Sequence, residues 1–262
     1  MVTDAGWDGE RVGEPRTVMI DIGGVLLLPD EQFWGRLQNE LGVDPAIDAE
    51  TLFYGSDGPW PACKTGRMDY ATYLGHLATV LRVDASRLAR LRAECEWVVN
   101  GPAVDWLRAV RERTGLEVIA VSNADTMLET RLEKLGLAPL FHHVVNSARV
   151  GSAKPDPDIY RHALALTTSP AGDCLFIDDQ LRNIPPAAAL GLKTALYTPG
   201  PEFAAALPDG LGRLYEETCA KDAGGTRAPR TAIPNAEGSP ARRDAQGFVG
   251  LNTKRKGTRH AQ

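Results

Sequence analysis

The chain has 262 residues, 43% hydrophobic and 24% charged, which suits a globular protein with one large domain and room for a smaller insertion. Its net charge of −5 is uneven, because residues 221–262 hold nine Lys/Arg against three Asp/Glu (+6) and residues 1–220 carry −11. The acidic body argues against nucleic acid as a partner. With no leader pattern, no apolar run near the roughly 18 residues that cross a bilayer, and no metal-type cysteine spacing, we expect no membrane partner and a cytoplasmic location.

Residues 1–15 are rich in Gly and charge without periodicity, and they are predicted to form a flexible N-terminus. Runs of strand length then alternate with helical patterns. The predicted strands, mostly apolar on both faces, are Thr17–Ile22, Glu117–Ser122, His143–Asn146, Cys174–Asp178 and Lys193–Tyr197. The helices between them are Val104–Arg113, Thr126–Leu135, Asp158–Leu166 and Ile184–Leu190. This alternation predicts an α/β fold with a doubly wound, Rossmann-like parallel sheet over residues 16–30 and 101–220.

About 95 residues separate the first two strands, far more than one crossover helix needs. Residues 31–100 show helical patterns at Glu31–Leu41, Tyr70–Leu81 and Ala85–Val98 and no clear strand. We therefore expect an inserted all-helical cap subdomain over residues 31–100, with Trp60–Arg67 as a loop between helices. Its hinges are expected near Pro29 and at residues 100–102. Residues 221–262 lack apolar periodicity and are predicted to be a disordered basic tail.

Polar residues follow four of the predicted strands. Asp21 follows Val-Met-Ile, Ser122-Asn123 end the second strand, Lys154 lies in Ser-Ala-Lys-Pro-Asp-Pro after the third, and Asp178-Asp179 end Phe-Ile-Asp-Asp. Because the carboxyl ends of parallel strands border one crevice, these groups are expected to converge. A carboxylate, a hydroxyl, a cation and an acidic pair suit phosphoryl transfer, in which an aspartate attacks phosphorus while a lysine and Mg²⁺ neutralise the oxygens.

The four motifs, in this order, resemble those of a haloacid dehalogenase (HAD) superfamily hydrolase with a helical cap inserted after the first motif. The resemblance covers roughly residues 16–200. It implies that Asp21 is the nucleophile and a Mg²⁺ ligand, that Gly23 offers its backbone carbonyl to the metal, and that Asp179 is the acidic ligand. It further implies that Ser122, with the backbone of Asn123, binds phosphate and that Lys154 holds nucleophile and phosphate together. Asp178 and Asn183 would support the metal site.

One position departs from the family pattern. Gly23 stands where its phosphatases keep a second aspartate, the general acid–base, whose assistance is typically worth about 10²–10⁴ in rate. Candidate replacements are Asp30, Glu31, His76 or an acidic group of the substrate. In the cap loop, Trp60, Lys64 and Arg67 either contact the substrate or are a packed ring and two solvated cations.

The function that the resemblance implies is a Mg²⁺-dependent phosphatase of a small phosphorylated metabolite, working through an aspartyl-phosphate intermediate. Two alternatives stay open. Gly23 motivates a weakly catalytic or non-catalytic phosphate-binding or regulatory protein. A dehalogenase-type hydrolase on the same scaffold is the other, although metal-free dehalogenases lack the acidic pair that Asp178-Asp179 supplies. Neither the substrate nor the oligomeric state follows from the sequence.

Overall fold

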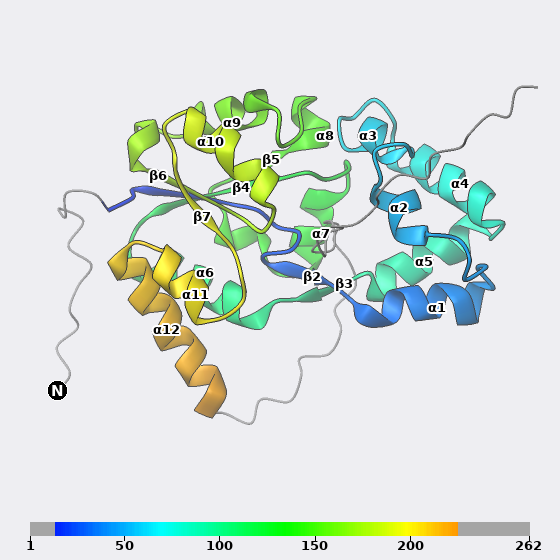
Figure 1. The fold of residues 1–262 in the computed structure, drawn as a ribbon, viewed down its shortest axis with the longest axis horizontal. Helices are drawn as coiled ribbons and strands as arrows, with labels where there is room; N and C mark the ends of the chain where they lie inside the picture. The colour runs from blue at the N-terminus through cyan, green and yellow to red at the C-terminus, as the bar shows by residue number, and fades with distance from the viewer. Residues whose placement is uncertain (1–13, 225–262) are drawn as a thin grey trace, which may run out of the picture.

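A computed structural model describes residues 14–224 (Figure 1). Most of the expected N-terminal segment, residues 1–13, and residues 225–262 of the expected tail lie outside this range. The central feature is a five-stranded parallel sheet in the order β5-β4-β1-β6-β7. Its strands are β1 (Thr17–Ile20), β4 (Glu117–Ser122), β5 (His143–Asn146), β6 (Cys174–Asp178) and β7 (Lys193–Leu196). The predicted α/β fold with a doubly wound parallel sheet is therefore confirmed.

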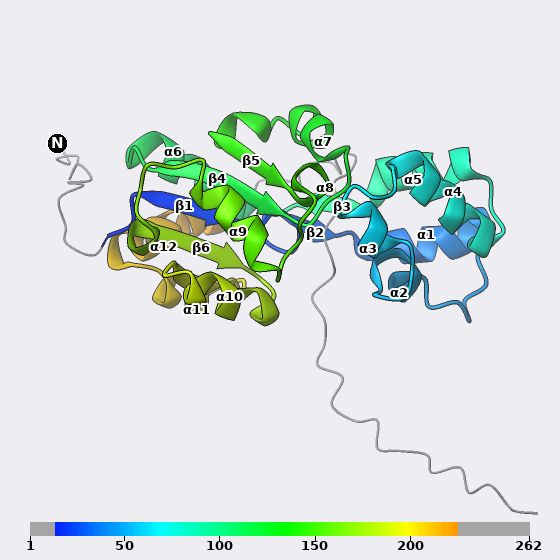
Figure 2. The ribbon, with the colours of Figure 1, turned by 90° about the horizontal axis from the view of Figure 1, so that it is seen from above.

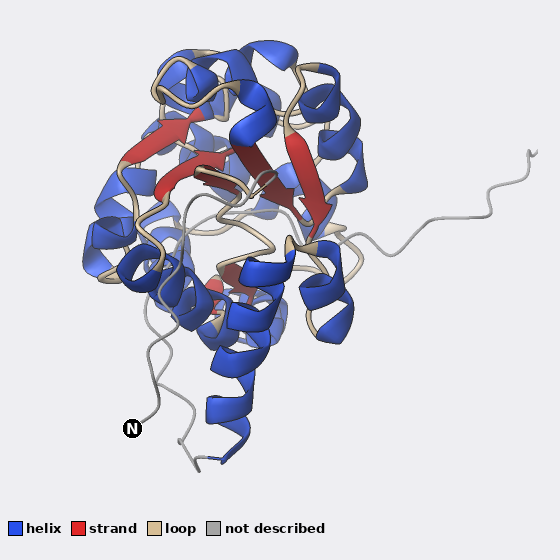
Figure 3. Ribbon diagram, turned by 90° about the vertical axis from the view of Figure 1, so that its left-hand side faces the viewer, coloured by secondary structure: helices blue, strands red, loops and turns tan. Residues whose placement is uncertain are grey.

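Helices cover both faces of the sheet (Figure 3). Alternate residues of β1 face opposite sides, so that Val18 and Ile20 join one buried cluster while Met19 joins another. The first cluster is covered by α6 (Gly101–Arg113), α7 (Leu128–Lys134), α11 (Pro201–Ala206) and α12 (Asp209–Gly224). The second is covered by α9 (Pro157–Leu164) and α10 (Ile184–Ala189). Burial on both faces explains why the inner strands β1, β4 and β6 are mostly apolar.

Residues 31–95 form a helical subdomain beside the carboxyl ends of the strands (Figure 2). It contains α1 (Glu31–Leu41), α2 (Ala49–Tyr54), α3 (Trp60–Cys63), α4 (Tyr70–Leu81) and α5 (Ala85–Cys95). Aspartate side chains cap the first turns of four of these helices: Asp30, Asp48, Asp69 and Asp84. The subdomain has its own buried cluster, which includes Phe33, Phe53, Tyr73, Leu77 and Leu88.

A two-stranded antiparallel ribbon joins the helical subdomain to the sheet domain. It pairs β2 (Leu27–Pro29) with β3 (Trp97–Val99). The expectation of no strand in residues 31–100 was therefore wrong, and the helix expected over Ala85–Val98 ends at Cys95. After the ribbon, Asn100 donates from Nδ2 to the Val25 carbonyl at 2.7 Å and to the Tyr197 hydroxyl at 2.6 Å. The second crossing is thereby fixed to the core.

Several shorter elements also differ from the expectations. The segment Trp60–Arg67 begins with the one-turn helix α3, whose first turn contains Pro61, rather than being a loop throughout. Helix α2 was not anticipated, and α12 runs to Gly224, past the expected start of the tail at residue 221. Short turns at Ala138–Leu140 (η1), Ala171–Asp173 (η2) and Leu181–Asn183 (η3), and the helix α8 (Ser147–Val150), complete the described chain. Within residues 14–224, no helix combines the length and the apolarity required to cross a membrane.

Candidate active site

Asp21 lies at the centre of the sheet edge, one residue after β1 ends. Its backbone N–H still donates to the Ile177 carbonyl of β6 at 2.9 Å, and its Oδ1 accepts from the Ile22 N–H at 2.7 Å. The side chain is only 5% exposed. Because β1 pairs with β4 on one side and β6 on the other, Asp21 occupies the point where the strand order reverses, which is where ligands bind in such sheets.

Lys154 bridges two carboxylates in this crevice. Its Nζ lies 2.7 Å from Oδ2 of Asp21 and 2.7 Å from Oδ2 of Asp178, and the side chain is 1% exposed. Burial alone would lower the pKa of Lys154, but the Asp178 and Asp21 carboxylates outweigh it and raise that pKa above its usual value. Burial raises the pKa of Asp21 to about 7, against the opposing effect of the Lys154 ammonium. The lysine therefore stays charged and favours the ionised form of Asp21.

Asp178 and Asp179 are adjacent in the chain, but their carboxylates have different contacts. Oδ1 of Asp178 accepts hydrogen bonds from the Gln180 N–H at 2.8 Å and from Asn183 Nδ2 at 2.9 Å, in addition to its Lys154 contact. Both oxygens of Asp179 are buried and, among the described residues, have no hydrogen-bond partner. Burial, together with the charges of Asp21 and Asp178, raises the pKa of Asp179 to about 8. A buried carboxylate with neither donor nor cation is costly, so Asp179 suits a ligand that supplies positive charge.

The donor set fits a hard divalent cation. One carboxylate oxygen from each of Asp21, Asp178 and Asp179 lies within 4.8 Å of the others. Oxygen ligands of this kind are those that Mg²⁺ prefers. The carbonyl of Gly23 accepts no backbone hydrogen bond from a described residue, which leaves it available as a further oxygen ligand.

Gly24 is a functional residue that the sequence analysis did not single out. It has a φ of +78°, and a Cβ at this position would lie 2.1 Å from Oδ2 of Asp179. A side chain here would both strain the backbone and displace that carboxylate. The two adjacent glycines therefore differ: the Gly23 carbonyl accepts no backbone hydrogen bond from a described residue, and Gly24 makes room for Asp179.

Ser122, the last residue of β4, and Asn123, which follows it, differ in their access to the pocket. Asn123 lines the pocket, and its side chain is fixed by two bonds to one residue: Oδ1 accepts from the Lys154 N–H at 2.7 Å and Nδ2 donates to the Lys154 carbonyl at 2.9 Å. Ser122 is 1% exposed, and its Oγ has no hydrogen-bond partner among the described residues. It is not one of the residues that line the pocket.

A pocket of about 110 Å³ lies between the sheet domain and the helical subdomain. Of the three candidates in the Trp60–Arg67 segment, Trp60 and Lys64 line it, whereas Arg67 is exposed and donates to Thr65 Oγ1 and the Pro61 carbonyl of its own loop. Sequence reasoning missed Tyr54 and Arg182. The full lining is Asp21, Tyr54, Gly55, Ser56, Trp60, Pro61, Lys64, Asn123, Lys154, Gln180, Arg182 and Asn183.

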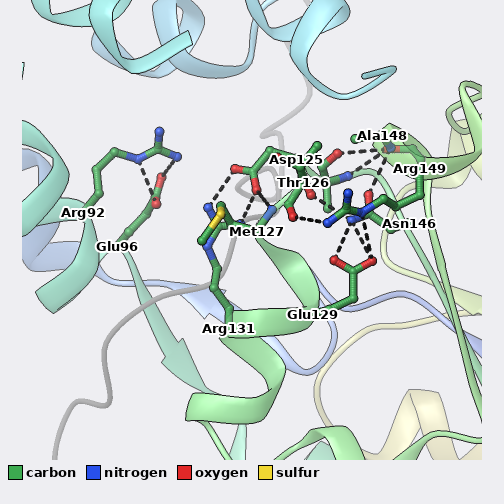
Figure 4. A network of polar contacts seen from close by, with 12 residues as sticks. Arg92, Glu96, Asp125, Thr126, Met127, Glu129, Arg131, Asn146, Ala148 and Arg149 are labelled. Carbon is green, nitrogen blue, oxygen red and sulfur yellow. Dashed lines mark hydrogen bonds and ion pairs between the residues drawn. The ribbon is translucent and has the colours of Figure 1, made fainter. Parts of the chain in front are cut away.

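Two contacts hold the helical subdomain over this pocket. Gly66 approaches the α8 backbone so closely that a Cβ would lie 2.2 Å from the Ala148 carbonyl oxygen. The ring of Tyr70 packs under the Arg131 guanidinium, 4.9 Å from centroid to Cζ. Arg131 in turn forms two 2.7 Å bonds to Asp125, in the loop that follows β4 (Figure 4).

The second charged pair in that view ties the pocket wall to the ribbon. Arg92 donates to both Glu96 oxygens, at 3.0 and 2.8 Å (Figure 4). Tyr54, a pocket residue, also donates its hydroxyl hydrogen bond to Glu96. Since Glu96 directly precedes β3, the wall formed by Tyr54 is anchored at the junction of the two domains.

None of the expected proton donors reaches the pocket. Asp30 caps α1 by accepting from the Gln32 N–H, and Glu31 and His76 are exposed. None of the three lines the pocket that contains Asp21.

Comparison with known proteins gives one family. The family profile described as haloacid dehalogenase-like hydrolase matches residues 15–191. Haloacid dehalogenase-like hydrolase domain-containing protein 3 from Bos taurus is 39% identical over 107 residues, which are 40% of this chain and 42% of that protein. The chain thus spans less than half the length of this curated relative.

Two solved structures share the fold. A HAD family enzyme from Bacteroides thetaiotaomicron, in complex with magnesium and inorganic phosphate, superposes with a TM-score of 0.59 at 20% identity, over 71% of this chain and 96% of that one. The L-2-haloacid dehalogenase from Xanthobacter autotrophicus, with chloropropionic acid covalently bound, gives a TM-score of 0.54 at 17% identity, over 78% and 88%.

Proposed function

The chain belongs to the haloacid dehalogenase-like hydrolase family, and from that membership and the site geometry we propose that it is a Mg²⁺-dependent phosphatase of a small phosphorylated metabolite. The observation that carries the proposal is Asp179, beside Asp21: both of its oxygens are buried and, among the described residues, accept no hydrogen bond and form no ion pair. The magnesium and phosphate bound by the Bacteroides thetaiotaomicron enzyme support the same assignment.

The residues have separate roles in this proposal. An oxygen of Asp21 attacks phosphorus as the bond to the leaving oxygen breaks, which gives an aspartyl-phosphate that water then hydrolyses. Lys154 holds Asp21 ionised and contacts the phosphoryl oxygens, and the backbone of Asn123, just after β4, binds them from the pocket wall. The neighbouring Ser122 supports this contact with an Oγ that has no hydrogen-bond partner among the described residues. Mg²⁺, held by Asp21, Asp179 and the Gly23 carbonyl, would supply further positive charge to the phosphoryl group when bound.

Halide hydrolysis is the competing activity on this scaffold, as the Xanthobacter autotrophicus enzyme illustrates. An alkyl halide has no phosphoryl group, so its hydrolysis needs no cation beside the nucleophile to balance phosphoryl charge. A site for such a substrate would therefore gain nothing from Asp179, whose burial costs free energy in the absence of a cation. The acidic cluster favours the phosphatase.

The test is hydrolysis of p-nitrophenyl phosphate by the full chain with Mg²⁺, with EDTA, and in an Asp21→Asn variant. We expect activity that EDTA removes and a loss of at least about 10³-fold in Asp21→Asn. Asp158→Asn, which alters an exposed aspartate of α9, is the matched control and should retain full activity. If wild type and Asp21→Asn give the same background, the phosphatase proposal fails. Chloride release from 2-chloropropionate that survives EDTA would instead establish the dehalogenase.

A further inference from the structure

Two cationic side chains in the pocket have no role in the chemistry described above. Lys64 follows α3 in the helical subdomain, and Arg182 lies in the η3 turn, three residues after Asp179. Both line the pocket that contains Asp21 and Lys154. The charge of Lys154 is already matched by two carboxylates at 2.7 Å. Lys64 and Arg182, in contrast, form no ion pair and no side-chain hydrogen bond with any residue in the described part of the chain.

This placement is unfavourable in the absence of a ligand. Lys64 is half-buried, and its pKa is lowered, first by that burial and second by the charge of Arg182. Arg182 is exposed and partly solvated, so the repulsion between the two like charges is reduced by water, yet neither side chain gains a partner among the described residues from its position at the pocket. The neighbouring Arg67 shows the alternative, because it turns out of the pocket and bonds to its own loop. An anion bound between Lys64 and Arg182 would remove the repulsion and satisfy both donors.

Resting on the phosphatase assignment, we propose that the substrate carries a second anionic group, which Lys64 and Arg182 bind while the phosphoryl group lies at Asp21. Because Lys64 and Arg182 line the same small pocket as Asp21, we expect the spacer between the two groups to be a few carbon atoms long. The substrate class is thus a short bisphosphate or a phosphorylated carboxylic acid. Because Lys64 comes from the helical subdomain and Arg182 from the sheet domain, the second anion also bridges the two domains.

The test uses probes that cannot be hydrolysed, so that binding is measured apart from turnover. Propylphosphonate has one anionic group, and 4-phosphonobutyrate and propane-1,3-bisphosphonate add a carboxylate or a second phosphonate at the far end of the same three-carbon spacer. Their Kd values for the full chain with Mg²⁺ are measured by calorimetry. We expect at least one two-anion probe to bind about tenfold more tightly than propylphosphonate, which corresponds to one charge-assisted hydrogen bond. The stronger of the two identifies the second group.

Variants assign the preference to residues. Lys64→Met and Arg182→Met should each remove most of the preference for the two-anion probes over propylphosphonate. Neither variant should lower the melting temperature, since each relieves a repulsion between the two cations. Arg67→Met, in the same loop but outside the pocket, should keep the preference. Equal Kd values for all probes, no binding of the two-anion probes, or a preference that survives in both variants would overturn the inference. Hydrolysis of p-nitrophenyl phosphate is scored separately, so a phosphatase without this preference contradicts only the inference, and a preference without turnover contradicts only the phosphatase.

Discussion

Replacement of Lys154 with methionine tests whether one ammonium group holds the acidic cluster together. Lys154 is 1% exposed and contacts Asp21 and Asp178, each at 2.7 Å. Methionine keeps much of the apolar stem but leaves the buried carboxylates without a cation. Removal of one partner from a buried pair costs about 3–5 kcal/mol. Because Asp21 and Asp179 already have raised pKa values, protonation in the variant relieves part of the repulsion at low pH, so we expect the smaller loss there.

The sign of the pH dependence follows from the same contact. Lys154 lowers the pKa of Asp21, so removal of the lysine raises that pKa further. Ionisation of Asp21 in the folded variant therefore costs free energy over a wider pH range. The loss of unfolding free energy relative to wild type should therefore grow from pH 6 to pH 8.5. Urea unfolding followed by circular dichroism, in EDTA, measures it. Lys134→Met, at an exposed lysine of α7, should change stability by less than about 0.5 kcal/mol. A Lys154→Met loss below about 1 kcal/mol at pH 8.5, against the 3–5 expected, or one that shrinks as pH rises, would refute the reasoning.

Three further predictions concern the metal and the proton. Gly24→Ala should cost about 1–2 kcal/mol of stability because of its positive φ, and it should weaken Mg²⁺ binding by displacing Asp179. The control is Gly42→Ala, at φ +72° with no atom near the added Cβ, which should show only the backbone cost. Equal Mg²⁺ affinity of the two variants in calorimetry would contradict the role of Gly24. Gly23→Asp restores the family's acid–base position and should raise kcat on alkyl phosphates by about 10²-fold or more while changing aryl phosphate hydrolysis little; no differential effect would mean that another group supplies the proton. The pKa values of Asp21 and Asp179 are raised to about 7 and about 8, so the stability of the metal-free protein falls as pH rises from the ordinary carboxyl range through these values. The gain in Tm on adding Mg²⁺ should therefore be larger at pH 8.5 than at pH 5.5. An equal gain at the two pH values would argue against Mg²⁺ binding at these carboxylates.

The parallel strands could be predicted almost residue by residue, because burial on both faces turns the inner strands into short apolar runs, and the partly exposed edge strands β5 and β7 still contain short apolar stretches. β4, for example, is buried from Val118 to Ser122 and was expected with the bounds observed. The β2–β3 ribbon could not be predicted from the sequence, because each strand is three residues long and its partner strand lies about 70 residues away. The six residues of α2 and the four of α3 are likewise too few to show a helical period.

The same division holds at the site. Asp21, Lys154, Asp178 and Asp179 meet because the carboxyl ends of adjacent parallel strands share one edge, a rule that needs only the strand order. Tyr54 enters the pocket only because the helical subdomain docks on the sheet domain. That docking depends on contacts such as Gly66 against Ala148, between segments about 80 residues apart. No local pattern in the sequence records such contacts.

The antiparallel ribbon has an evolutionary consequence. Because Pro29 and Trp97 are partners across it, their Cα atoms lie about 5 Å apart, so the chain leaves and re-enters the sheet domain at one point. Any segment whose ends are as close could replace residues 30–96 without a change to the strands that carry Asp21, Lys154 and Asp179. Tyr54, Trp60 and Lys64 all belong to the exchangeable segment. Selection can therefore alter what enters the pocket while the reacting groups are inherited unchanged.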